Sequence, residues 1–174
     1  MNFPFIKNPI ARFLSIALLL YVAWYLLYEL WLSPEGTIDN IIIDNLIVVS
    51  STILNWMGFS TSWNAFTDDA MKIIAIEKTG GVWIGVPCNG MSLFALFTGF
   101  IIAYPGKLVR KLIYIPIGIL SIHLINVVRV VALCLIAYKL PPEYLAFNHT
   151  YTFTIIVYAF VFFLWMLWTN KYSK

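Results

Sequence analysis

Long apolar stretches constrain the fold of this chain more than any other feature of its sequence. Residues 13–32 carry no charged side chain before Glu29, and residues 112–138 carry only Arg129. Crossing the hydrocarbon core of a membrane takes about 20 mostly apolar residues. Charged residues make up 11% of the sequence, against about 25% in soluble domains. These features predict an all-α polytopic membrane protein that forms a single domain over residues 1–174.

We expect about four transmembrane helices, at residues 13–32, 88–105, 112–138 and 150–168. Lys and Arg are enriched in cytoplasmic loops, so their positions indicate the orientation. The basic residues near the predicted span ends are Lys7, Arg12, Lys107, Arg110, Lys111, Lys171 and Lys174. Placing them all in the cytoplasm puts both termini inside and residues 32–87 outside. This outer segment is rich in acidic residues, namely Glu35, Asp39, Asp44, Asp68, Asp69 and Glu77, and it also contains Lys72 and Lys78.

The outer segment contains two further predicted elements. Residues 38–59 are hydrophobic but interrupted by polar side chains, and a crossing there would move the basic loop at 107–111 outside. We therefore expect an amphipathic helix at the membrane interface, and a re-entrant arrangement stays open. Residues 71–77 and 82–86 are β-prone and flank Gly80-Gly81, which predicts a short β-hairpin leading to Cys88.

Arg129 is the strongest single indication of function. A charged side chain within a spanning helix is costly and is usually partnered, although snorkelling to the headgroups is an alternative. At 1.5 Å per residue it lies roughly 27 Å beyond Lys111, in the outer leaflet. Asn126 lies about 60° from Arg129 around the helix, so the two form a polar stripe that faces the bundle.

The other histidine and cysteine of this span have a different setting. His123 lies about 120° from Arg129, and Cys134 about 140° from it. We interpret His123 as a hydrogen-bonded packing residue, with a proton relay as the alternative. Cys134 is interpreted as a small buried hydrophobe.

Cys88 lies where the chain enters a helix whose N-terminus faces outside, next to Asn89. The thiolate is the nucleophilic form of cysteine, and a helix N-terminus or a guanidinium stabilises it. His149 lies in the outer loop before the last span, where an imidazole can act as general base and then general acid. Taken alone, each has a structural alternative: an incidental or disulfide-forming cysteine, and an interfacial histidine.

Together, Cys88, Arg129 and His149 lie at one depth on one side of the membrane. Acyl transfer by a thiol needs a nucleophile, a proton shuttle and an oxyanion stabiliser, which these residue types supply. We expect no metal site and no cofactor, because two His and two Cys do not converge and the spans contain few carboxylates. No basic and aromatic surface for nucleic acid is evident either.

The order Pro87-Cys88-Asn89-Gly90, then Asn126-Val-Val-Arg129, then His149 resembles the exosortase/archaeosortase family, in its bacterial branch. The resemblance covers residues 82–154, and the small size is similar to the compact exosortases described in Bacteroidetes. In many members a serine stands where Asn89 does. The resemblance implies a cysteine transpeptidase or protease in the bacterial cytoplasmic membrane with an extracytoplasmic active site. Its partners would be membrane lipid and exported proteins that end in a short motif, a transmembrane helix and a basic tail.

By this resemblance Cys88 would be the nucleophile, His149 the acid/base and Arg129 the oxyanion or thiolate stabiliser, with Asn126 and Asn89 in support. Two other functions stay open. A non-enzymatic scaffold or assembly factor would use the same pocket to hold a partner helix, with Arg129 pairing a carboxylate. A small transporter would line a path with Arg129, Asn126 and His123, but four spans leave little room for alternating access.

Overall fold

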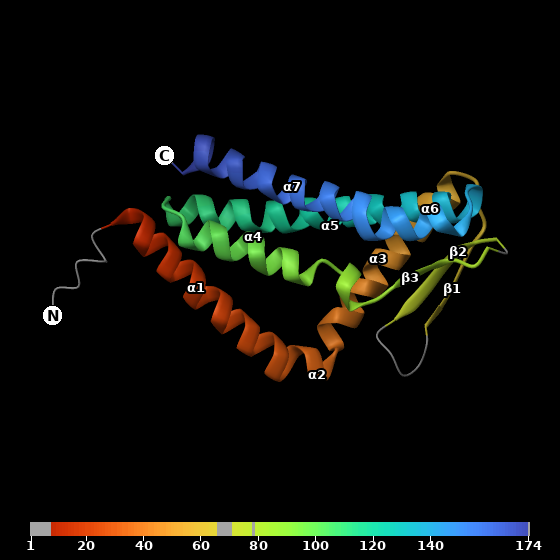
Figure 1. The fold of residues 1–174 in the computed structure, drawn as a ribbon, viewed down its shortest axis with the longest axis horizontal. Coiled ribbons are helices and arrows are strands. Elements are labelled where there is room, and N and C mark those ends of the chain that lie inside the picture. Colours follow the sequence, from red (N-terminus) through yellow and green to blue (C-terminus); the bar gives the residue numbers. More distant parts are fainter. Residues whose placement is uncertain (1–7, 66–70, 78, 174) are drawn as a thin grey trace.

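The computed structural model describes residues 8–65, 71–77 and 79–173, and most of them are helical (Figure 1). Four helical stretches are long and apolar enough to cross a membrane. These stretches are Pro9–Glu35, Thr37–Trp56, Leu108–Lys139 and Pro142–Tyr172. The predicted all-α polytopic membrane fold is therefore confirmed.

The long stretches are built from consecutive helical elements. The first joins α1 (Pro9–Leu27), a wider turn at Tyr28–Leu32 and α2 (Ser33–Glu35). The third is the single helix α5 (Leu108–Lys139). The last joins α6 (Pro142–Phe147), a wide π-helical turn at Asn148–Thr152, α7 (Phe153–Leu167) and a final wide turn at Trp168–Tyr172.

The helix expected at 88–105 forms, but it is shorter than predicted. α4 covers Met91–Ala103 and has 13 residues, which at 1.5 Å per residue is about 20 Å. Gly90 precedes it with φ of +84°, and Tyr104 ends it in an extended conformation. By itself α4 is too short for the hydrocarbon core of about 30 Å.

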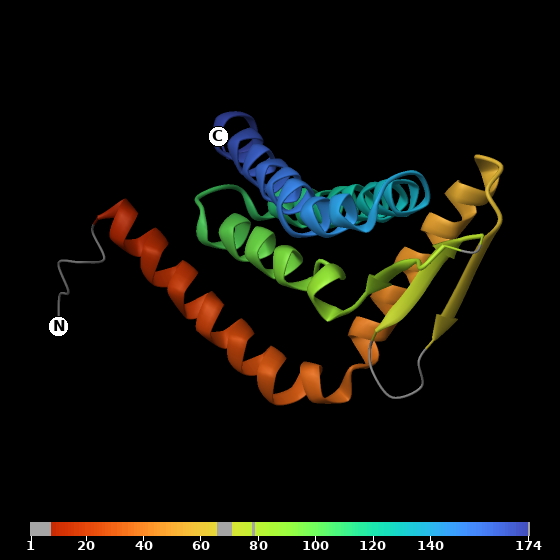
Figure 2. The same ribbon diagram turned by 45° about the vertical axis from the view of Figure 1, so that its right-hand side comes forward.

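The segment predicted as an interfacial helix, residues 38–59, forms the 20-residue helix α3 (Thr37–Trp56). Its length and composition are those of a membrane span, so the interfacial placement stays a prediction. Figure 2 shows α3 running obliquely to α4, α5 and α7. It packs against α5, and its buried face includes Asp39 as well as Ile43 and Leu46.

The predicted hairpin is confirmed: β2 (Lys72–Ile76) pairs antiparallel with β3 (Val82–Ile84). A third strand, β1 (Thr61–Ala65), adds to the other edge of β2 and was not predicted. Lys72 forms an ion pair with Asp44 of α3, which ties the sheet to that helix. The sheet therefore has a fixed place at one end of the bundle.

Two clusters of buried apolar side chains hold the bundle together, and α5 contributes to both. The first joins α3, the sheet and the C-terminal half of α5, and its buried members are Ile43, Leu46, Ile47, Leu54, Ile74, Ile76, Val82, Ile84, Val127, Val130, Leu133 and Cys134. The second joins α4, α5, α7 and the turn that follows it, and comprises Phe97, Ile101, Ile122, Val161, Leu164 and Trp168. Asn126 and Arg129 lie on α5 at the junction between these clusters.

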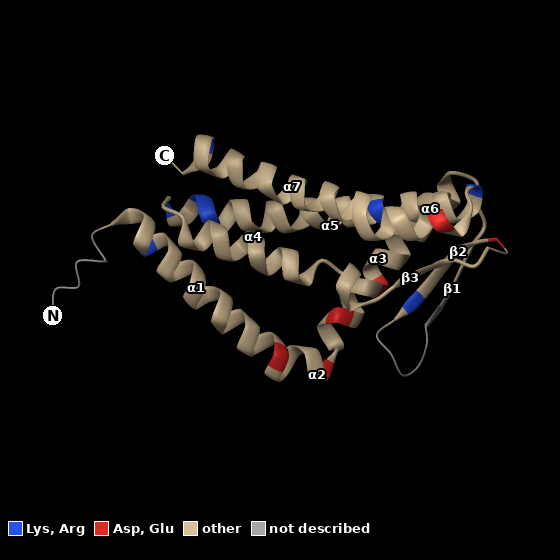
Figure 3. Ribbon diagram, in the orientation of Figure 1, with Lys and Arg blue, Asp and Glu red and all other residues tan. Residues whose placement is uncertain are grey.

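Charged side chains are segregated along the bundle (Figure 3). Basic residues gather at the end where α1 begins and α7 ends, whereas the acidic residues lie toward the other end. Lys72 lies on β2 and Lys139 is the last residue of α5, so basic residues also lie toward the second end and the separation is not complete. The sequence analysis also assigned a side of the membrane to five residues that lie outside the described part of the chain, namely Lys7, Asp68, Asp69, Lys78 and Lys174.

Candidate active site

Cys88 ends a short 3₁₀ turn, Val86–Cys88, that connects β3 to α4. Its backbone N–H donates to the Gly85 carbonyl at 2.8 Å, and its side chain is partly exposed. The sheet delivers the chain to this turn, and α4 starts three residues later. The thiol therefore lies close to the N-terminus of an apolar helix, as the sequence predicted.

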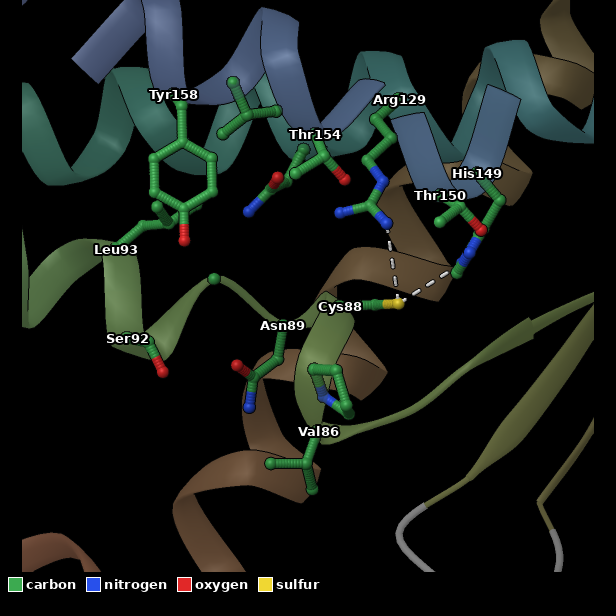
Figure 4. A pocket seen from close by; sticks show the side chains of 14 residues that line it. Val86, Cys88, Asn89, Ser92, Leu93, Arg129, His149, Thr150, Thr154 and Tyr158 are labelled. Atoms are coloured by element: carbon green, nitrogen blue, oxygen red, sulfur yellow. Dashed lines mark hydrogen bonds between the residues drawn. The ribbon is translucent and has the colours of Figure 1, made fainter. Parts of the chain in front are cut away.

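Arg129 reaches this thiol from α5, which lies alongside α4. Its Nη2 atom is 3.7 Å from the Cys88 Sγ, within the range of a hydrogen bond to sulfur. The side chain is partly buried, and in Figure 4 its guanidinium points toward the sulfur. The charge that interrupts the longest apolar helix thus has a defined partner.

His149 approaches the same sulfur from the wide turn between α6 and α7. Its Nε2 atom lies 3.4 Å from the Cys88 Sγ (Figure 4). π-helical turns inside helices are rare and often occur at functional sites. Three separate elements therefore bring Cys88, Arg129 and His149 together.

The three side chains line one cavity of about 450 Å³. Polar side chains also line it, since α7 supplies Thr154 and Tyr158 and the turn before it supplies Thr150. Apolar Leu93 and Val157 also line it. Figure 4 shows the sulfur exposed to this space between the guanidinium and the imidazole.

Asn126 also lines the cavity and has an unusual environment. It is 1% exposed, and neither its amide oxygen nor its amide nitrogen has a hydrogen-bond partner among the described residues. A buried polar group left unpaired costs about 1–3 kcal/mol. The amide packs closely on Gly90, where a Cβ would lie 2.3 Å from the Asn126 Nδ2. The amide therefore lies at the cavity with unused hydrogen-bonding capacity.

Asn89, the second predicted supporting residue, points away from the sulfur in Figure 4. Its Oδ1 accepts from the Met91 backbone N–H at 2.8 Å, at the start of α4. Its Nδ2 donates to Asp39 of α3. Asp39 also accepts from the Tyr28 hydroxyl, 3.2 Å from its Oδ2.

Asp39 and Tyr28 are the residues that sequence reasoning missed. Asp39 was noted only among the acidic residues of the outer segment, and Tyr28 was not singled out. A carboxyl group on the buried face of an apolar helix was the available signal, because such groups need partners.

The remaining histidine and cysteine lie elsewhere. The His123 Nε2 is 2.8 Å from the Asn45 Oδ1 on α3, and it does not line the cavity. Cys134 is 1% exposed within the cluster of α3, the sheet and α5. Within residues 8–65, 71–77 and 79–173, no group of three or more His, Cys, Asp or Glu side chains is placed to hold a metal ion.

The chain was compared with protein families, curated proteins and solved structures. The family model described as transmembrane exosortase matches residues 7–169, which is nearly the whole sequence. Neither the curated proteins nor the solved structures gave a match.

Proposed function

Because the chain belongs to the transmembrane exosortase family, we propose that it is a cysteine transpeptidase or protease acting on C-terminal sorting signals of exported proteins. Membership of this family suggests a membrane transpeptidase role in protein sorting. The observation that carries the assignment to particular residues is the position of the Cys88 Sγ. It lies between the Arg129 guanidinium at 3.7 Å and the His149 imidazole at 3.4 Å, at a cavity of about 450 Å³.

In the first half-reaction, the Cys88 thiolate attacks the carbonyl carbon of the scissile peptide. A C–S bond forms, and the carbonyl π electrons move to the oxygen to give a tetrahedral oxyanion. The oxyanion then collapses, the C–N bond breaks, and His149 gives a proton to the departing amine. The product is a thioester on Cys88 and a released C-terminal fragment. His149 obtains its proton from the Cys88 thiol, whose sulfur lies 3.4 Å from the Nε2 atom.

In the second half-reaction, an amine or a water molecule attacks the thioester. Neutral His149 accepts the proton of the attacking group, the C–S bond breaks, and the sulfur leaves as thiolate. Attack by an amine gives transpeptidation, and attack by water gives hydrolysis. The acceptor comes from outside the chain, so the same residues serve both outcomes.

Arg129 and Asn126 supply the electrostatic contribution. The guanidinium lies close enough to the sulfur to stabilise a thiolate and then the oxyanion that forms beside it. The Asn126 amide is buried at the same wall of the cavity and has no partner among the described residues. We propose that it donates to a carbonyl of the bound peptide, because a buried amide gains most from a ligand that satisfies it.

An apolar groove beside the cavity fits the helical part of a sorting signal. It is about 410 Å³ in volume and lies between α1, α4 and α7. It shares Ser92, Leu93 and Tyr158 with the cavity at Cys88, so the two are continuous. Ala95 and Gly99 line it on successive turns of α4, and small residues at this spacing let a second helix approach closely. We propose that the substrate helix packs here and directs its outer end to Cys88.

Substitution at Gly99 tests the position of the substrate helix. A Cβ at this position would meet no other atom within 4 Å. Gly99→Leu should therefore fill the groove without disturbing the bundle, and Gly99→Ala is the matched control. We expect the leucine variant to raise KM for a substrate with its helix and to leave KM unchanged for a short peptide without it. An unchanged KM for the full substrate would contradict this position.

The activity itself is tested by Cys88→Ala, with Cys134→Ala as the control for loss of a thiol. The substrates to follow are exported proteins of the same cell that end in a short motif, an apolar helix and a basic tail. We expect Cys88→Ala to leave their tails attached while the variant still inserts in the membrane, whereas Cys134→Ala supports removal. Normal removal by Cys88→Ala would contradict the proposal and favour a scaffold.

A further inference from the structure

We propose that Asp39 is a positioning residue that sets the orientation of the Cys88 turn from α3. This inference rests on the proposed function, in that it concerns the same nucleophile. Asp39 is 2% exposed, and Asn89, the residue after Cys88, is 1% exposed. A direct hydrogen bond joins the two, although they are 50 residues apart in the sequence.

The side chain of Asn89 has both of its ends occupied. Its oxygen accepts from the Met91 backbone N–H, one of the groups at the start of α4 that lack a partner within the helix. Its nitrogen donates to Asp39 Oδ1. Rotation of Asn89 would break both contacts, so the backbone of residues 88–90 is held between α3 and α4.

Asp39 is in turn held from the wide turn Tyr28–Leu32, which follows α1. The Tyr28 hydroxyl lies 3.2 Å from Asp39 Oδ2 and 3.4 Å from Oδ1. The carboxyl group thus accepts from two donors on two other elements. An asparagine at position 39 would have one acceptor oxygen and an amide donor in place of the second oxygen. Against an unchanged Asn89, this side chain would therefore have one acceptor fewer for the two donors.

The arrangement matters for catalysis because Cys88, which carries the sulfur, is bonded through the backbone to Asn89. Reacting groups must be held closely, and a displacement of about 1 Å can cost about 100-fold in rate. Asp39 does not line the cavity, so its effect on substrate would pass through Asn89 and Cys88. We therefore expect Asp39 to affect kcat more than KM.

Exchange of the two side chains provides the test. Asn89→Asp alone places two carboxyl groups against each other, which is unfavourable. Asp39→Asn combined with Asn89→Asp restores the hydrogen bond between the two positions and keeps those to Met91 and Tyr28. The new amide at 39 donates to the carboxylate at 89, which still accepts from the Met91 N–H, and the amide oxygen accepts from Tyr28.

We expect Asn89→Asp to lower kcat by about 100-fold and the double variant to recover most of that loss, with KM changing little. A double variant no more active than Asn89→Asp would overturn the proposal. Tyr28→Phe removes one hydrogen bond, for which about 0.5–1.5 kcal/mol corresponds to about a two- to tenfold fall in kcat. An unchanged kcat in this variant would also overturn it.

A second measurement separates this proposal from the proposed function. The rate at which iodoacetamide alkylates Cys88 reports the exposure and orientation of the thiol, with or without a substrate. We expect Asn89→Asp to change this rate and the double variant to return it to that of the unsubstituted protein. Equal rates in all three proteins would overturn the positioning role even if Cys88 is the nucleophile. If Cys88→Ala processes substrates normally, the alkylation result still decides whether Asp39 positions the turn.

Discussion

The Cys88 Sγ and the His149 Nε2 lie 3.4 Å apart although 61 residues separate them in the chain. The thiol follows a strand, and the imidazole lies on a widened helical turn, so each comes from an irregular segment. Regular helices α4, α5 and α7 hold these two segments in place around one cavity. The distance between the two atoms therefore depends on how the helices of the bundle pack. The contact itself depends on both side chains.

Replacement of His149 by glutamine should remove the proton shuttle while keeping a polar side chain. We expect kcat/KM for tail removal to fall by about 10²- to 10⁴-fold, the usual contribution of general acid–base catalysis. His123→Gln is the matched control, because His123 contacts Asn45 and does not line the cavity. Similar losses in the two variants would show that His149 has no special part in proton transfer.

Replacement of Arg129 tests the role of the guanidinium at the sulfur. Arg129→Gln should lower kcat by about 10²- to 10³-fold, as loss of an oxyanion donor does. Arg129→Lys keeps the charge but loses the planar arrangement of donors, so it should recover only part of the rate. Steady-state kinetics on a membrane-reconstituted substrate measure the difference. Full activity in Arg129→Gln would contradict the proposed stabilisation.

The contact between Gly90 and Asn126 should be visible in stability measurements. Gly90→Ala introduces a Cβ at φ of +84° and 2.3 Å from the Asn126 Nδ2. Gly58→Ala is the control, because its φ is +90° and no atom lies within 4 Å of its Cβ. Both variants should lose about 1–2 kcal/mol of unfolding free energy from the backbone conformation. Gly90→Ala should lose about 1–3 kcal/mol more from overpacking.

Thermal or denaturant unfolding in detergent gives the comparison between these glycine variants. Equal losses would mean that the Asn126 side chain moves aside without cost. A larger loss in Gly90→Ala that disappears when Asn126→Ser is added would assign the excess to this one contact.

The two cysteines should differ in reactivity, because Cys88 is partly exposed at the cavity and Cys134 is buried. Iodoacetamide added to the folded protein should modify Cys88 and leave Cys134 unmodified until the protein is denatured. Mass spectrometry of the two cysteine-containing peptides measures the extent of modification. A membrane-impermeant maleimide applied from one side of sealed vesicles would also identify the side on which Cys88 opens. Early modification of Cys134 would contradict the packing around it.

The main features of the site were predictable because polar residues are conspicuous in an apolar sequence. Arg129 interrupts a long apolar helix, and the helical angle from Asn126 indicated that the two share a face. The contact between Asp39 and Asn89 was not predictable in the same way. It depends on how α3 crosses the bundle, which no local pattern in residues 38–59 specifies.

The third strand, β1, was also not predictable from local sequence. β2 and β3 were predictable from β-prone residues around Gly80-Gly81. β1 is the short sequence Thr-Ser-Trp-Asn-Ala, whose strand conformation depends on pairing with β2. An edge strand with little apolar alternation acquires its structure from its neighbour, so its own residues do not indicate it.

The close fit of Asn126 against Gly90 has a consequence for how the protein meets its lipid environment. A methyl group on this glycine would lie 2.3 Å from the Asn126 Nδ2, so the start of α4 packs directly on a side chain of α5. The tilt of a membrane helix is set by packing against its neighbours. We therefore expect α4 and α5 to tilt together in bilayers of different thickness, with little change in the distance between the Cys88 sulfur and the Arg129 guanidinium.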